Sequence, residues 1–166
     1  MDRIPGVGSE MQRHSVLIFL FDGVQALGFS GPTDVFSCGN SATGDGSVWY
    51  DVRTVSADGT AVLTSCGLRV KPDGCIADVA DVGTLVVPGA DGIPRTVPET
   101  VRALGPLARQ AQRVAAVGTG AFLLAQMGLL DGREVVTHWE FTEEFTHRFP
   151  LVTLRRENLV VADGFI

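Results

Sequence analysis

The stretch Arg113–Ala125 constrains the possible fold more than any other part of the chain. Its sequence, RVAAVGTGAFLLA, predicts a buried strand that turns sharply into a helix. Many α/β hydrolytic enzymes mount a nucleophile on such an elbow. The residue at the apex is Gly118, which has no side chain and cannot attack a substrate. The pattern therefore predicts the frame of a catalytic site without its reactive group.

Apolar runs alternate with helical patterns along the whole chain. This alternation indicates an α/β fold, with a mainly parallel sheet sandwiched by helices. We expect strands at 15–21, 50–56, 84–87, 114–117, 134–137, 151–154 and 159–161, helices at 32–38, 98–112, 119–130 and 139–149, and a hairpin formed by 61–64 and 68–70. One helix start has a specific local signal, because Thr137-His-Trp-Glu140 matches a capping box with Thr137 as N-cap and Glu140 at the third helical position.

The length of 166 residues predicts one domain. Residues 1–14 are expected to be a loose N-terminal tail, with Met11 as an alternative translation start, and residues 15–166 to form the domain. The last predicted strand has no covering helix after it, which is unusual for a sheet of this kind. We therefore expect a fragment or a truncated gene, with the domain incomplete at its C-terminus.

Charge and cysteine usage exclude several classes of protein. The net charge of −6 gives no electrostatic footprint for nucleic acid, so this chain by itself is not expected to bind DNA. The apolar run Val16–Phe21 is too short for a membrane span. The three cysteines lack metal-ligand spacing, which predicts reduced thiols in a cytoplasmic protein and no metal or other cofactor.

Ligands of doubly wound sheets bind beyond the carboxyl ends of the strands. Backbone N–H groups around the elbow are expected to hold an anionic or carbonyl-bearing ligand there. The residues at these ends, which we expect to bind a small molecule, are Gly28, Gly89, Ala90, Gly118, Thr119 and His138.

Several ordered motifs together resemble one known family. They are Phe21–Phe36 (FDGVQALGFSGPTDVF), Tyr50–Ser56, Ser65–Arg69 (SCGLR), Thr84–Gly89 (TLVVPG), the elbow, Gly128–Gly132 (GLLDG) and Thr137–Trp139. From about Ser15 to the last residue the chain is similar to the ThiJ/PfpI superfamily. Within it the chain most resembles the glutamine-amidotransferase-like ligand domain of AraC-type transcriptional regulators, with isonitrile hydratases as near relatives.

The resemblance implies a flavodoxin-like fold that often forms a homodimer. In the enzymes of the family, a cysteine at the elbow pairs with an acidic residue. The family's elbow cysteine falls on Gly118, and the acidic partner of that cysteine falls on Gly28. Thr119 and His138 match pocket residues, and Gly89-Ala90 matches a loop whose backbone would bind an oxyanion. The resemblance thus implies a ligand site in which glycine occupies both reactive positions, so that no catalytic residue remains.

Three functions remain open on the sequence. The first is a noncatalytic small-molecule-sensing domain of an AraC-like regulator, with DNA binding supplied by a C-terminal helix-turn-helix absent from this chain. The second is an enzyme of the isonitrile hydratase, glyoxalase or amidase type, using water polarised by His138. In a variant of this hypothesis, Gly118 was engineered to inactivate a hydratase. The glycine at the second reactive position, Gly28, argues for natural loss instead. The third is a nonfunctional fragment or a stand-alone dimerisation module.

Individual residues also have purely structural interpretations. His138 is as well explained by a helix start as by a pocket role. The three cysteines are interpreted as packed or incidental thiols, because none lies at a strand-to-helix elbow. Gly118-Thr-Gly120 resembles part of the dinucleotide fingerprint, but Leu123 stands at its third small position, so no nucleotide is expected.

Overall fold

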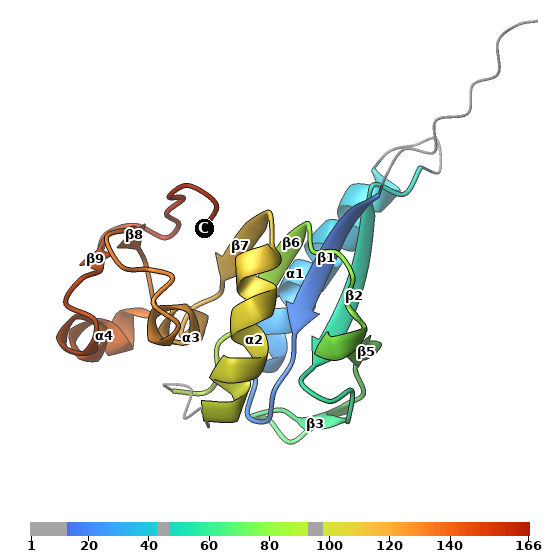
Figure 1. The fold of residues 1–166 in the computed structure, drawn as a ribbon, viewed down its shortest axis with the longest axis horizontal. Helices are drawn as coiled ribbons and strands as arrows, with labels where there is room; N and C mark the ends of the chain where they lie inside the picture. Colours follow the sequence, from blue (N-terminus) through green and yellow to red (C-terminus); the bar gives the residue numbers. More distant parts are fainter. Residues whose placement is uncertain (1–12, 43–46, 93–97) are drawn as a thin grey trace, which may run out of the picture.

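A five-stranded parallel sheet forms the centre of the computed structural model, which describes residues 13–42, 47–92 and 98–166. The strand order is β5-β2-β1-β6-β7. The strands are β1 (His14–Phe19), β2 (Tyr50–Ser56), β5 (Gly74–Cys75), β6 (Thr84–Val87) and β7 (Arg113–Ala116). Figure 1 shows α1 (Ala26–Ser41) behind this sheet and α2 (Pro98–Gln110) in front of it. The predicted flavodoxin-like α/β class is confirmed.

The central strand β1 owes its position to its apolar sequence. Val16, Leu17, Ile18 and Phe19 are all fully buried, as expected for a parallel strand covered on both faces. Val16 pairs with Val52 of β2 on one side and with Thr84 of β6 on the other. Burying each such side chain stabilises the fold by about 1.5–3 kcal/mol.

The remaining elements lie at the ends and edges of the sheet. The predicted hairpin is present as β3 (Val62–Leu63) and β4 (Arg69–Val70). A short 3-10 helix at Ile76–Asp78 follows β5. Beyond β7 the chain forms α3 (Gly120–Gln126), β8 (Glu134–Val135), a 3-10 helix at Trp139–Phe141, α4 (Thr142–Arg148) and β9 (Thr153–Leu154). The predicted strands 134–137 and 151–154 are present in shorter form as β8 and β9, which pair with each other in a separate parallel sheet.

The first helix begins six residues earlier than predicted. The sequence suggested a start at Pro32, but α1 begins at Ala26 and contains Pro32. A proline inside a helix costs about 3 kcal/mol. The contacts at the helix start oppose that cost, because Gln25 N–H donates to the Gly89 carbonyl at 3.0 Å and the Gly28 N–H donates to the Gln25 carbonyl at 3.0 Å.

Two other predictions near the chain end are wrong. The expected strand 159–161 is absent, and Leu159 is 96% exposed. The helix expected over 119–130 ends at Gln126, because Gly128 has φ +69° and so leaves the helical conformation. The short strand β5 was not predicted, since Gly74 and Cys75 carry no strand pattern. Of the predicted tail, residues 1–12 lie outside the described part of the chain.

Candidate functional site

The predicted elbow lies between β7 and α3. Gly118 at its apex has φ +54°, a conformation that side chains other than glycine's adopt only with strain. A Cβ atom placed on Gly118 would have no described neighbour within 4 Å, so a side chain here would stand in open space. The apex therefore has the shape of a nucleophile mount and carries no nucleophile.

Thr119 ties the elbow to the loop that follows β6. The side chain is buried, and its hydroxyl accepts a hydrogen bond from the Ala90 N–H at 3.0 Å and donates one to the Ala90 carbonyl at 3.2 Å. Gly89 has to be glycine for this approach, because a Cβ there would lie 2.5 Å from the Thr119 hydroxyl. Thr119 is thus a structural bridge between the two loops as well as a predicted pocket residue.

Thr137 is a site residue that sequence reasoning assigned to the wrong role. The capping-box prediction is wrong, because the buried Thr137 hydroxyl donates to the Gly118 carbonyl at 3.2 Å. The N-cap is His138, whose Nδ1 accepts from the Glu140 N–H at 3.4 Å. Thr137 is the last residue of the predicted strand 134–137, and a place at the carboxyl end of a strand was the available signal for a site role.

The turn after β1 completes the floor of the site. Val24 pairs with Ala90 as an isolated antiparallel bridge. Gly28 lies buried in the first turns of α1, and a Cβ on it would be 3.3 Å from the Pro88 Cβ and 3.7 Å from the Gly89 nitrogen. The structure therefore brings five of the six predicted ligand residues together, namely Gly28, Gly89, Ala90, Gly118 and Thr119.

His138 stands apart from these five in its contacts. Its exposed ring stacks on Trp139 with centroids 5.6 Å apart and lies 5.7 Å from the ring of Phe141. Within the described part of the chain, the one hydrogen bond of this ring is the bond that Nδ1 accepts from the Glu140 N–H. Because Nδ1 accepts that bond, the neutral imidazole carries its proton on Nε2 and can donate it to a ligand. His138 reaches the elbow only through its neighbour Thr137.

The described contacts of Asp22 and of the three cysteines are with groups other than those of the elbow. Asp22 accepts a hydrogen bond from the Leu63 N–H at 2.8 Å and so anchors the β3–β4 hairpin. Cys38 is exposed on α1. The hydroxyl of Thr64 lowers the pKa of the Cys66 thiol below its usual value, and this cysteine lies in the hairpin turn. Cys75 donates to Asp78 beside β5.

The elbow offers backbone donors in place of reactive side chains. The N–H groups of Gly118 and Thr119 find no acceptor within the described residues, whereas those of Gly120 and Ala121 bond back to Val117 and Gly118. Two such donors side by side match a carbonyl or carboxylate oxygen. The described residues contain no cluster that could hold a metal ion, and none of their helices is long and apolar enough to cross a membrane.

Comparison with known proteins supports the resemblance seen in the sequence. The family model of the DJ-1/PfpI family matches residues 14–164. This chain belongs to the DJ-1/PfpI family. The match includes β1, the elbow and β9, so the whole described sheet falls within the family domain.

Curated relatives in this family differ in kind. The chain is 42% identical over 139 residues to an uncharacterized protein in cpoL 5′ region of Streptomyces lividans, covering 82% of this chain and 96% of that one. It is 33% identical to the HTH-type transcriptional regulator GbdR of Pseudomonas aeruginosa, covering 90% of this chain and 41% of the regulator. It is 32% identical to an isonitrile hydratase of Pseudomonas putida, covering 74% of this chain and 51% of the enzyme.

Solved structures show the same fold. A putative transcriptional regulator from Vibrio parahaemolyticus superimposes with a TM-score of 0.79 at 19% identity, covering 92% of this chain and 81% of that one. An AraC family transcriptional regulator from Pseudomonas putida gives 0.72 at 24% identity, covering 86% and 76%. The family thus contains both enzymes and regulators, and the chain spans about two fifths of the length of GbdR.

Proposed function

We propose that this chain is a noncatalytic domain of the AraC-regulator type that senses a small molecule, or mediates dimerisation, through an elbow whose nucleophile is replaced by glycine. The observation that carries this proposal is the apex of the elbow, where Gly118 has φ +54° and no side chain. A domain without a catalytic thiol can still bind a ligand, because the backbone N–H donors and the loop contacts of the elbow do not require the thiol. The similarity to GbdR supports the regulator class.

The ligand proposed for this site carries a carbonyl or carboxylate group. Its oxygen would accept from the N–H groups of Gly118 and Thr119, which no described residue occupies. Gly28, Gly89 and Ala90 would form the wall, because Gly89 and Ala90 adjoin Thr119 and Gly28 lies beside Gly89. His138 would close the rim by donating from Nε2. Metal and cofactor play no part in this proposal.

The acidic chain leaves DNA binding to another part of a regulator. A net charge of −6 works against contacts with DNA phosphates. In the regulator proposal a helix-turn-helix follows Ile166 in the natural protein, and the domain acts as a homodimer in the cytoplasm. Half-sites in DNA would then be read by the paired helix-turn-helix units.

The natural gene product tests this arrangement. We expect its intact mass, measured by mass spectrometry and supported by the coding DNA, to exceed the 17.6 kDa of this chain and to include a helix-turn-helix. A product of 17.6 kDa would contradict the regulator form of the proposal and favour a stand-alone ligand-binding or dimerisation module. The relative from Streptomyces lividans, of which the chain covers 96%, shows that such a short protein exists in the family.

An enzyme is the second candidate, favoured by the 32% identity to an isonitrile hydratase. It would need water polarised by His138 in place of a thiol. Removing the nucleophile of an enzyme built around one costs up to about 10⁶ in kcat. We therefore expect no turnover of isonitriles, 2-oxoaldehydes or small amides above the blank, measured by product formation with an isonitrile hydratase as positive control. Turnover that His138→Ala abolishes would overturn the noncatalytic proposal.

A further inference from the structure

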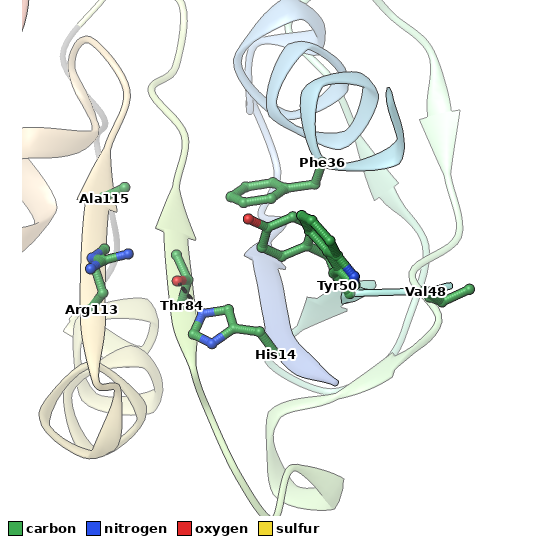
Figure 2. Close-up of a pocket in the computed structure, with 8 residues that line it drawn as sticks. His14, Phe36, Val48, Tyr50, Thr84, Arg113 and Ala115 are labelled. Atoms are coloured by element: carbon green, nitrogen blue, oxygen red, sulfur yellow. Dashed lines mark hydrogen bonds between the residues drawn. The ribbon is translucent and has the colours of Figure 1, made fainter. Parts of the chain in front are cut away.

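A cavity lies at the opposite end of the sheet from the elbow. Its volume is about 500 Å³, within the range of small-molecule sites. It is lined by the first residues of four strands together with α1 and the segment before β2. The lining residues are His14, Phe36, Val48, Trp49, Tyr50, Thr84, Arg113 and Ala115. Figure 2 shows Phe36 and Tyr50 on one side of the cavity and Arg113 and Ala115 on the other.

One wall of this cavity is aromatic and held in place. The rings of Phe36 and Tyr50 meet edge to face with centroids 5.0 Å apart. Asn40 fixes the backbone beside them, because its side-chain oxygen accepts from the N–H groups of Trp49 and Tyr50 at 2.9 and 2.8 Å. Its amide nitrogen donates to the Tyr50 carbonyl at 2.8 Å. A wall fixed in this way loses little conformational entropy when a planar ring packs on it.

The opposite wall carries a cation. Arg113 begins β7, and its guanidinium forms no ion pair or hydrogen bond with any described residue. None of the described residues that line the cavity is acidic. The floor between the walls is polar, and its two polar groups are hydrogen-bonded to each other: His14 Nε2 lies 2.8 Å from the Thr84 hydroxyl. The cavity is therefore positive at one side and apolar at the other, in a chain of net charge −6.

The spacing of the strands sets the size of what fits between these walls. β2 and β7 are separated by β1 and β6, which puts their backbones about 14 Å apart at ~4.8 Å per strand. The Tyr50 hydroxyl points to the β6 side in Figure 2, and Arg113 lies on β7 on the far side of the gap. A planar ring with a short acidic group fits into the space between these walls, whereas a folded peptide is too large for it.

We propose that this cavity binds a small aromatic carboxylate. Its ring packs against Phe36, Tyr50 and Trp49, and its carboxylate pairs with the Arg113 guanidinium, which matches a carboxylate in a bidentate geometry. This site is separate from the elbow, which lies beyond the carboxyl ends of the same strands. The proposal does not depend on the function proposed for the elbow.

The two tryptophans report on the two sites separately. Trp49 lines this cavity, and Trp139 stacks on His138 beside the elbow. In the full chain labelled with 5-fluorotryptophan, the ¹⁹F signals are assigned with Trp139→Phe, and the protein is titrated with benzoate. We expect the Trp49 signal to move and saturate with a Kd at or below about 1 mM, while the Trp139 signal stays in place.

Variants and a neutral probe test the charge. Arg113→Met is expected to weaken benzoate binding about 10- to 100-fold, because a charge-assisted bond is lost. Arg69→Met, on the exposed strand β4, is the matched control and should leave the titration unchanged. Benzamide should bind as weakly to the parent chain as benzoate does to Arg113→Met. A shift of Trp139 alone, equal affinity in Arg113→Met, or no shift of Trp49 at 10 mM benzoate (about ten times the expected Kd) would each overturn the proposal.

Discussion

A cysteine introduced by Gly118→Cys is expected to react with iodoacetamide about tenfold faster than Cys38 at pH 7. Its Cβ would stand in open space, so the reagent can reach it. The unoccupied N–H groups of Gly118 and Thr119 would favour the thiolate over the thiol. A thiol pKa lowered by little more than one unit from its usual 8.5 raises the thiolate fraction about tenfold.

The labelling experiment needs a background free of a competing thiol. Cys66 is exposed, and the Thr64 hydroxyl already lowers its pKa, so it should be replaced by Cys66→Ser before rates are compared. Cys38 on α1 then serves as the internal reference in the same molecule. Rates are read by peptide mass spectrometry at several pH values. Equal rates at the two positions would mean that the elbow no longer activates a thiol.

The same substitution has a cost in stability. A residue with a Cβ at φ +54° is strained by about 1–3 kcal/mol, and we expect the free energy of unfolding to fall by that amount. Adding Gly28→Asp costs more, because its Cβ would meet the Pro88 Cβ at 3.3 Å and the neighbours must shift. The carboxyl group raises reactivity further only if it donates a hydrogen bond to the thiolate, which the pH profile of the double variant would show.

The sequence predicted the parts of this fold that depend on local patterns. The run Val16–Phe19 is apolar without alternation, and it is the fully buried central strand. The turn Val117-Gly-Thr-Gly120 after β7 predicted the elbow, and Gly118 adopts a positive φ there. The capping box failed because a distant group competes for the hydroxyl of Thr137. The Gly118 carbonyl lies 19 positions away in sequence, and no local motif encodes that contact.

The cavity at the amino ends had no sequence signal at all. Phe36, Tyr50 and Arg113 come from separate elements, and they line one cavity because the strand order places β2, β1, β6 and β7 side by side. Arg113 appeared in the sequence only as the first residue of the elbow motif. Sequence reasoning looked for ligands at the carboxyl ends of the strands, where the rule for doubly wound sheets places them. That rule does not address the opposite end.

Phe145→Ala is expected to lower the free energy of unfolding by about 3–5 kcal/mol, the largest loss from one substitution proposed here. Phe145 is fully buried and is the only buried residue of α4. Its ring meets Phe122 edge to face at 4.9 Å and lies 5.0 Å from Phe149. The cavity left by the ring would remain lined by these two aromatic side chains. Stability is measured by urea unfolding followed by circular dichroism.

The exposed neighbour His147 supplies the control. His147→Ala changes the same helix outside the cluster and should alter stability by no more than about 0.5 kcal/mol. A loss below 1 kcal/mol for Phe145→Ala, well under the range for a buried phenylalanine, would show that α4 is not packed on α3 in solution.

The aromatic cluster also links stability to the candidate site. Phe122 lies on α3, three residues after Thr119 of the elbow, and α4 directly follows the 3-10 helix Trp139–Phe141 at the rim. In Phe145→Ala the short helices α3 and α4 lose their shared contact, so the rim beside His138 should loosen before the main sheet unfolds. Hydrogen exchange should then rise first at residues 138–149. Uniform exchange across the chain would mean that rim and sheet unfold as one unit.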